Sequence, residues 1–268
     1  MKVATIQMNS TPDVTQNLGV AGTLLSEAAA GGAVLAVLPE NFAIMGAREA
    51  DRLAVAEAPG AGPIQDALAE LAQKLSLWIV AGTLPIRGQT AKRVAPAAVV
   101  FDANGRQVAR YDKMHLFDVD IPEKKEIYRE SATFEPGKEP ILVETPAGKL
   151  GLSVCYDLRF PELYRQLSAR GAQLLAVPAA FTVPTGLAHW EVLLRARAVE
   201  NLCYVLAAAQ WGLHANGRET YGDAMIVDYW GRVLARRAAG AGVVLAEIDG
   251  AAQASVREGF PALKHRVL

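Results

Sequence analysis

Three short segments place a reactive side chain directly after an apolar run of the chain. The first is LPENF with Glu40, the second is YDKMHLFD with Lys113 and His115, and the third is GLSVCYDLRFPELYR with Cys155. A thiolate can attack an acyl carbon, a carboxylate or an imidazole can take the thiol proton, and an ammonium can stabilise the developing oxyanion. Together these residue types favour nucleophilic catalysis through a thioester.

Each segment alone also has a purely structural explanation. Glu40 could cap a helix or a turn, Lys113 could lie at the exposed end of a hairpin, and His115 could be a hydrogen-bonded structural group beside apolar residues. Cys203 lies in the apolar run NLCYV and is predicted to be a small buried hydrophobe. The functional reading therefore depends on the segments taken together.

Cys155 has the most informative surroundings of these residues. An apolar strand is expected to end at Cys155, and a helix is expected to open close behind, with Asp157 as a possible cap and Pro161 in the first turn. A strand, turn and helix in this order can present a nucleophile at a sharp elbow. A helix N-terminus would lower the thiol pKa below its free value of ~8.5.

A cysteine nucleophile needs a base, and two arrangements remain open. In a Cys–His pair the base would be His115, since His189 opens a predicted helix, His214 lies in a Gly/Asn loop and His265 lies in the tail. In the alternative, a glutamate takes the thiol proton and a lysine stabilises first the thiolate and then the oxyanion.

The elements that must position these residues alternate between apolar strands and helices. Strands and helices follow one another as in β-α-β units, interrupted by a hairpin at Asn104-Gly105. We expect strands at 3–8, 33–38, 78–84, 97–101, 107–111, 141–144, 150–154, 173–177, 204–209, 224–228, 232–236 and 243–248, and helices at 14–30, 63–77, 160–169 and 188–201. So many apolar strands predict two packed sheets covered by helices, a single-domain four-layer α-β-β-α sandwich over 1–268 in the α/β class.

The composition and charge of the chain argue against a protein that binds nucleic acid or a membrane surface. The chain has 268 residues, 51% of them hydrophobic, and a formal net charge of −1, so neither nucleic acid nor a membrane surface is an expected partner. The longest apolar stretch, 174–188, is interrupted by prolines. The two cysteines are far apart and outside any CxxC or Cys/His cluster, which predicts neither a disulfide nor a metal site and favours the cytoplasm.

Taken together, the three segments resemble the nitrilase-like carbon–nitrogen hydrolases, whose triad is Glu, Lys and Cys. The resemblance runs from Lys2 to about Ile248 and implies Glu40, Lys113 and Cys155 as that triad, with no metal and no organic cofactor. It also implies a second glutamate, Glu130, in a segment that composition alone would assign to a solvated loop. The stretch FTVPTGLAHWEVLLRARAVENLCYVLAAAQWGLH is most similar to the deaminated glutathione amidases. A homodimer is a further implication of the resemblance.

The expected reaction is hydrolysis of the terminal amide of a small carboxylate-bearing acid, deaminated glutathione being the favoured substrate. Glu40 would be the general base, Lys113 and the backbone N–H after Cys155 would stabilise the oxyanion, ammonia would leave, and Glu130 would orient Lys113.

For the far end of the substrate, Arg159 is the candidate carboxylate clamp, because a guanidinium binds a carboxylate bidentately. The competing explanation is a salt bridge on the first helical turn. Thr185 and His189, expected in the loop before the HWE helix, are further substrate-binding candidates. The alternatives are an ω-amidase, another amide or nitrile hydrolase of this type, or a non-catalytic scaffold with the same fold.

Overall fold

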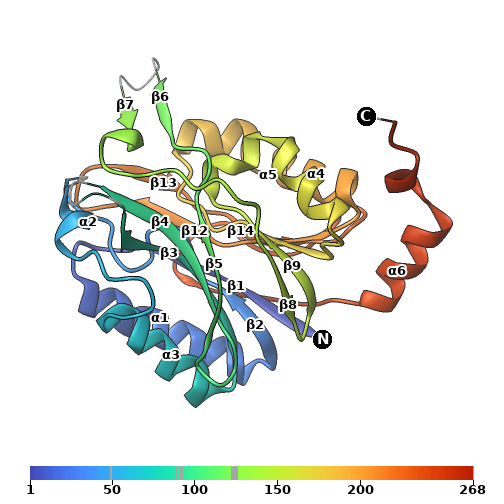
Figure 1. Ribbon diagram of the computed structural model, residues 1–268, viewed down its shortest axis with the longest axis horizontal. Helices are drawn as coiled ribbons and strands as arrows, with labels where there is room; N and C mark the ends of the chain where they lie inside the picture. Colours follow the sequence, from blue (N-terminus) through green and yellow to red (C-terminus); the bar gives the residue numbers. More distant parts are fainter. Residues whose placement is uncertain (49, 89, 91–92, 122–125, 268) are drawn as a thin grey trace.

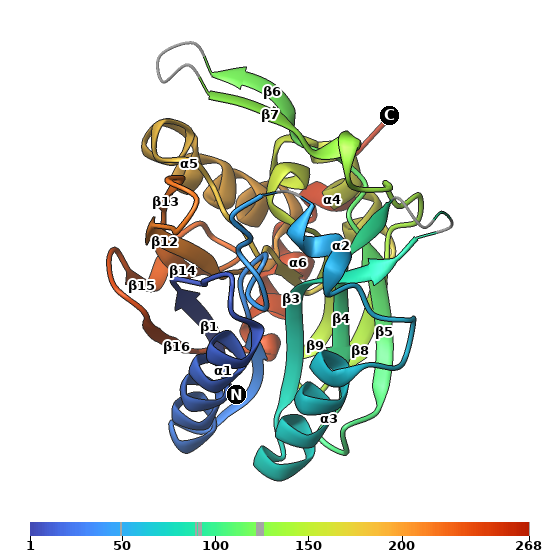
Figure 2. The ribbon, with the colours of Figure 1, turned by 90° about the vertical axis from the view of Figure 1, so that its left-hand side faces the viewer.

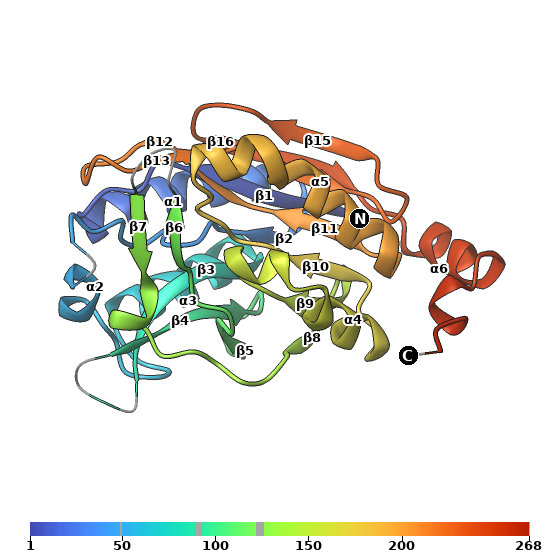
Figure 3. The same cartoon turned by 90° about the horizontal axis from the view of Figure 1, so that it is seen from above.

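In the computed structural model, which describes residues 1–48, 50–88, 90, 93–121 and 126–267, two large β-sheets pack face to face. Helices α1 and α3 cover the outer face of one sheet, and α4 and α5 cover the outer face of the other (Figure 1). Figure 3, which looks onto the second helical layer, shows α4 and α5 above the strands of the second sheet. The expected four-layer α-β-β-α sandwich is therefore confirmed.

The first sheet has the strand order β13-β12-β1-β2-β3-β4-β5, with β16 paired to β1. Its strands are β1 (Lys2–Met8), β2 (Ala33–Val37), β3 (Trp78–Arg87), β4 (Val94–Phe101), β5 (Gln107–Asp112), β12 (Ala209–Leu213), β13 (Glu219–Tyr221) and β16 (Gly242–Glu247). The second sheet has the order β15-β14-β11-β10-β9-β8. Its strands are β8 (Leu142–Thr145), β9 (Gly148–Leu152), β10 (Leu174–Ala176), β11 (Tyr204–Ala207), β14 (Ala224–Val227) and β15 (Val233–Arg237).

The helices are α1 (Val14–Ala30), α2 (Asp51–Ala54), α3 (Pro63–Leu75), α4 (Pro161–Ala169), α5 (Val183–Asn201) and α6 (Gly250–Gly259). Helix α1 has the predicted bounds, and the side chain of Asp13 caps it by accepting from the backbone N–H of Gln16. In the described residues, no helix is both long enough and apolar enough to span a bilayer.

Side chains that alternate between the two faces of each strand in the first sheet build two apolar clusters, one between the sheets and one under helices α1 and α3. In β2, Leu35 and Val37 pack into a cluster shared with the second sheet, whereas Ala36 packs against the helices outside. Successive side chains of a strand point to opposite faces, so an unbroken apolar run is what a strand buried on both faces requires.

Helix α5 begins earlier than predicted, at Val183 rather than Ala188. The expected helix began at Ala188 and left Thr185 in the loop before it. Proline has no N–H to lose in the first helical turn, and its fixed φ suits that position. Thr185 and His189 therefore lie on the helix and not in a loop before it.

Two strand predictions were wrong in their bounds. The apolar run 204–209 was expected to be one strand, but β11 ends at Ala207 in the second sheet, and β12 begins at Ala209 in the first. Strand β9 ends at Leu152, and a 3₁₀ turn, η3 (Cys155–Arg159), separates it from α4. An apolar run does not mark the point at which the chain leaves one sheet for another.

Several elements were not predicted because their sequences are short or polar. They include α2, α6, β13 and a hairpin of β6 (Asp118–Ile121) and β7 (Glu126–Arg129), followed by the 3₁₀ turn η2 (Glu130–Ala132). A further 3₁₀ turn, η4 (Ala262–Lys264), follows α6. Figure 2 shows the β6–β7 hairpin projecting from the body of the molecule.

Strand β1 joins the two ends of the chain within the first sheet. It pairs with β2 on one side and, antiparallel, with β16 on the other, from Lys2 opposite Glu247 to Gln7 opposite Gly242. The backbone N–H of Ile248 continues this pairing by donating to the carbonyl of Met1.

Gly82 lies where β3 passes very close to the chain leaving β2. A Cβ on Gly82 would lie 1.8 Å from the carbonyl oxygen of Pro39. The next residue, Thr83, accepts a hydrogen bond of 2.8 Å from the backbone N–H of Asn41. Gly82 thus allows β3 to hold the segment that carries Glu40.

Gly82→Ala is expected to lower the free energy of unfolding by about 1–3 kcal/mol, because the added methyl group must displace backbone. The matched control is Gly19→Ala, at an exposed position of α1 where a Cβ meets no atom within 4 Å. This control is expected to raise the free energy of unfolding by about 0.5–1 kcal/mol. Urea denaturation measures both, and equal stability of the two variants would contradict the close approach.

Candidate active site

Glu40, Lys113, Glu130 and Cys155 line one pocket, although they lie far apart in the sequence. Glu40 follows β2, Lys113 follows β5, and Glu130 follows the β6–β7 hairpin, whereas Cys155 follows β9 of the second sheet. The pocket is small, with a cavity volume of about 20 Å³. Its remaining lining residues are Phe117, Tyr156, Arg159, Ala180, Phe181, Thr182, Thr185 and Arg218.

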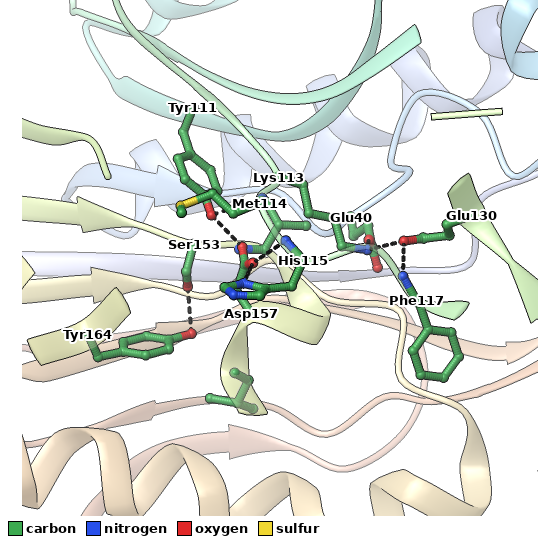
Figure 4. A network of polar contacts seen from close by, with 12 residues as sticks. Glu40, Tyr111, Lys113, Met114, His115, Phe117, Glu130, Ser153, Asp157 and Tyr164 are labelled. Carbon is green, nitrogen blue, oxygen red and sulfur yellow. Dashed lines mark hydrogen bonds and ion pairs between the residues drawn. The ribbon is translucent and has the colours of Figure 1, made fainter. Parts of the chain in front are cut away.

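The ammonium of Lys113 is buried between two carboxylates. Its Nζ lies 2.9 Å from Glu40 Oε1 and 2.8 Å from Glu130 Oε2. Figure 4 shows the Lys113 side chain beside both glutamates. Burial alone would lower the pKa of Lys113, but the charges of Glu130 and Glu40 outweigh it and hold this pKa above its ordinary value. The lysine therefore stays protonated, and the cluster of three side chains carries one net negative charge.

The backbone around Glu40 is fixed from two sides. Asn41 adopts a φ of 58°, in the left-handed region, and its N–H donates to Thr83. The side chain of Gln210, from β12, donates a hydrogen bond of 3.1 Å to the carbonyl of Glu40. The carboxylate thus leaves the end of β2 in a defined direction, toward Lys113.

Glu130 is held by Lys113 and by the backbone of the preceding segment. The N–H of Phe117 donates a 2.7 Å hydrogen bond to Glu130 Oε2 (Figure 4). The side chain is only 17% exposed. Composition alone assigned this residue to a solvated loop, and that assignment was wrong because a polar hairpin can fold back over a charged cluster.

Cys155 occupies a strained backbone position at the start of η3. Its φ is 47°, and its N–H donates a 2.9 Å hydrogen bond to the carbonyl of Pro178. A non-glycine residue in the left-handed region is uncommon and is found often at functional sites. The expected elbow is present, formed by a 3₁₀ turn rather than by the first turn of α4.

The expectation of a lowered thiol pKa was wrong. Burial raises the pKa of Cys155 well above its ordinary value, the negative charge of Glu40 raises it further, and Lys113 only partly offsets these effects. Helix α4 begins only at Pro161, and so its N-terminus is not at the sulfur. The thiol therefore needs a base to remove its proton.

A buried carboxylate, Asp157, ties the elbow to the lysine segment. Its Oδ2 accepts from the N–H of Val154 at 2.8 Å and from the hydroxyl of Tyr111 at 2.7 Å. Its Oδ1 accepts from the N–H of His115 at 3.1 Å and lies 2.7 Å from Nδ1 of that ring (Figure 4). Asp157 was expected to cap the following helix, but it caps η3 instead, and α4 has no side-chain cap. It also fixes the chain beside Lys113.

His115 has a structural environment. Besides its contact with Asp157, its ring stacks on Phe160 with centroids 3.7 Å apart, and it is not among the residues that line the pocket. Cys203 is likewise structural: it is buried beside the guanidinium of Arg257, and burial raises the pKa of Cys203 to about 12. The geometry favours the glutamate and lysine arrangement over a Cys–His pair.

Arg159 lines the pocket but forms no salt bridge with a carboxylate in the described part of the chain. Its guanidinium lies 5.7 Å from the ring centroid of Phe181 and 3.3 Å from Nδ1 of His189. His189 itself is exposed and outside the lining, whereas Thr185 lines the pocket and hydrogen-bonds Thr182. In the described residues, Arg159 therefore does not form the salt bridge on the first helical turn that was the competing explanation for it.

Arg218 also lines the pocket, and the sequence analysis did not identify it. It lies in a polar turn, and nothing in HANGRET indicates that the turn reaches Cys155. Among the described residues, no group of three or more His, Cys, Asp or Glu side chains could hold a metal ion.

Comparison with known proteins agrees with this geometry. Residues 2–258 match the family model described as "Carbon-nitrogen hydrolase". The chain is 46% identical to the deaminated glutathione amidase of Synechocystis sp., over 98% of this chain and 97% of that protein.

Solved structures are similar over nearly the whole chain. Saccharomyces cerevisiae Nit3, a member of branch 10 of the nitrilase superfamily, superposes with a TM-score of 0.89 at 30% identity, covering 100% of this chain and 97% of that chain. A mutant of the amidase from Nesterenkonia sp. AN1 has a TM-score of 0.82 at 28% identity, covering 100% of this chain and 94% of that chain. Its structure shows covalent addition of the acetamide moiety of fluoroacetamide at the active site cysteine. The chain described here thus belongs to the carbon–nitrogen hydrolase family of the nitrilase superfamily, and it is an enzyme that hydrolyses carbon–nitrogen bonds.

Proposed function

We propose that this enzyme hydrolyses the amide of a small carboxylate-bearing acid, with deaminated glutathione as the substrate, through a thioester on Cys155. The observation that carries the proposal is the buried Lys113 ammonium, held between Glu40 and Glu130 in the pocket that Cys155 lines. The similarity to deaminated glutathione amidases supports the choice of substrate.

In the first half-reaction, Glu40 takes the proton of the Cys155 thiol as the sulfur attacks the amide carbon. The carbonyl oxygen becomes an oxyanion, which Lys113 Nζ and the N–H of Tyr156 stabilise. The proton on Glu40 then passes to the leaving nitrogen, and the carbon–nitrogen bond breaks. A raised thiol pKa fits this sequence, because proton removal is coupled to attack.

The identity of the leaving group follows from the substrate. Glutathione is a γ-glutamyl tripeptide, so cleavage of its deaminated form at the γ-amide releases the amine of a cysteinylglycine dipeptide. The ammonia expected from the sequence would leave only from a primary amide. In the second half-reaction, Glu40 takes a proton from water, which attacks the thioester and frees the acid and the thiol.

The other residues of the pocket have supporting roles in this proposal. Glu130 orients Lys113 through the 2.8 Å ion pair and contacts the substrate amide. Arg159 binds the carboxylate of the acyl part, His189 positions that guanidinium, and Thr185 offers a hydroxyl on the same wall of the pocket. Both cysteines are free thiols, which supports a reducing compartment, and we retain the cytoplasm as the proposed location.

We also propose that the enzyme is a homodimer that pairs through the outer face of α5. Leu187, Val192 and Val199 on this helix are 70%, 61% and 50% exposed. Together with Tyr221, they line a groove on the surface. An exposed apolar face of this kind is typical of an interface between protein chains.

Cys155→Ala is expected to abolish hydrolysis of deaminated glutathione without unfolding the protein. Release of cysteinylglycine by the unchanged enzyme, measured by liquid chromatography, tests the proposed function. Acid-quenched unchanged enzyme should carry an acyl adduct on Cys155, detected by peptide mass spectrometry. Cys203→Ala is the matched control and should retain turnover. An adduct on Cys203, or turnover by Cys155→Ala, would disprove the assignment.

Glu40→Gln is expected to slow both half-reactions by ~10² or more, because the amide keeps the shape of the side chain without its basicity. Burst kinetics with an ester analogue separates thioester formation from thioester hydrolysis. His115→Ala should reduce kcat much less, although it should lower stability, since it removes a partner of buried Asp157. A larger loss of kcat in His115→Ala than in Glu40→Gln would indicate a Cys–His mechanism.

Val192→Glu combined with Val199→Glu is expected to convert the dimer to a monomer, because the charges would be buried in the interface. Sedimentation velocity measures the change in mass. Val20→Glu, at a partly exposed position on α1, is the control and should leave the assembly unchanged. An unchanged sedimentation coefficient in the α5 variant would place the interface elsewhere.

A further inference from the structure

Arg218 is fixed in place by the turn between β12 and β13. The ring of His214 is buried in this turn, with Nδ1 3.1 Å from the carbonyl oxygen of Ser10 and Nε2 2.7 Å from the hydroxyl of Thr220. The N–H of His214 donates a 2.8 Å hydrogen bond to the carbonyl of Arg218. The backbone of Arg218 is therefore anchored to the first sheet.

The guanidinium of Arg218 reaches the pocket from that anchor. Its Nη2 donates to the carbonyl of Ala180, and its Cζ lies 5.1 Å from the ring centroid of Tyr128 on β7. Tyr128 in turn packs against Phe117, whose N–H binds Glu130. These contacts place Arg218 on the side of the pocket formed by the β6–β7 hairpin.

The guanidinium retains hydrogen-bonding capacity there. No carboxylate of the described residues forms an ion pair with Arg218, and its Nε is buried without a hydrogen-bond partner in that part of the chain. A guanidinium on the wall of the pocket without a carboxylate partner among the described residues can bind the carboxylate of a ligand bidentately.

The charges around the cavity also favour an anion with two negative groups. Lys113, Glu40 and Glu130 together have a formal charge of −1. Adding the guanidiniums of Arg159 and Arg218 gives the lining of the pocket a formal charge of +1. The two guanidiniums have different supports: Arg159 packs on Phe181, and Arg218 packs on Tyr128. They can therefore bind two separate carboxylates.

We propose that Arg218 binds a carboxylate in the leaving group of the substrate, so that the enzyme prefers N-substituted amides with a carboxylate on each side of the scissile bond. This inference rests on the proposed function, in which Arg159 takes the carboxylate of the acyl part. A second carboxylate, bound by Arg218 on the β6–β7 side of the pocket, then belongs to the amine that leaves when the amide is cleaved. Arg218 acts as a specificity residue, because it contacts the carboxylate of the leaving group and not the atoms that react.

The test uses two substrates that differ only in this one charge: N-glutarylglycine, with a carboxylate at each end, and N-glutarylglycinamide, with a neutral amine part. In Arg218→Met, the ratio of kcat/KM for N-glutarylglycine to that for N-glutarylglycinamide should fall ~10- to 100-fold, mainly through KM, as expected for loss of one charge-assisted contact. Arg218→Lys should restore part of the ratio, since it keeps the charge without the planar fork.

Two further variants separate this role from others. Arg159→Met should lower kcat/KM for both substrates and leave their ratio nearly unchanged. Arg106→Met, exposed in the turn between β4 and β5, is the matched control and should change neither constant. Thermal unfolding of each variant identifies losses that come from stability. Equal losses on both substrates in Arg218→Met, or an unchanged ratio, would overturn the inference.

Binding provides a measurement that does not depend on turnover. Titration calorimetry of both compounds into Cys155→Ala, with and without Arg218→Met, should show the same loss of preference for N-glutarylglycine. If the unchanged enzyme cleaves neither compound nor deaminated glutathione, the proposed function is wrong, while the calorimetry still decides the role of Arg218. An identical ratio of Kd values in the two backgrounds would disprove it.

Discussion

The buried ion pairs of Lys113 are the constraint on which the rest of the structure depends. An unpaired ammonium at this depth would be strongly destabilising, so both carboxylates must reach it at hydrogen-bonding distance. The three side chains come from the end of β2, the end of β5 and the segment after β7, and each is fixed by its own backbone contacts. The first sheet and the separate β6–β7 hairpin thus supply the charged cluster, and the second sheet brings the sulfur to it.

In the proposed mechanism, this division keeps the sulfur as a thiol until a substrate binds. Burial of Cys155 and the negative charge of Glu40 both raise the thiol pKa, and a thiol is a weaker nucleophile than a thiolate. A substrate that enters the pocket supplies the carbonyl on which charge can develop next to Lys113. Reactivity is then tied to substrate binding, because the oxyanion is the species that the ammonium stabilises best.

The strand, turn and helix pattern around Cys155 indicated an elbow, but the residues alone left the base open between Glu40 and His115. Resemblance to a family decided for Glu40 and Lys113. Glu130 could be found only through resemblance to a family, since a short polar hairpin has no apolar pattern to mark it. Arg218 carries no signal, because its position depends on how a polar turn of the first sheet meets the hairpin. The layers were predictable from alternating strands and helices, whereas the start of α5 and the change of sheet between β11 and β12 depend on tertiary contacts.

The pairing of β1 with β16 has a consequence for synthesis of the chain. Residues 2–7 are synthesised long before residues 242–247, the strand that pairs with their free edge. Until those residues leave the ribosome, β1 exposes unpaired backbone groups and an apolar face, the features that promote aggregation. The first sheet therefore cannot close until residue 247 has been synthesised, and its closure joins two segments that are far apart in the sequence.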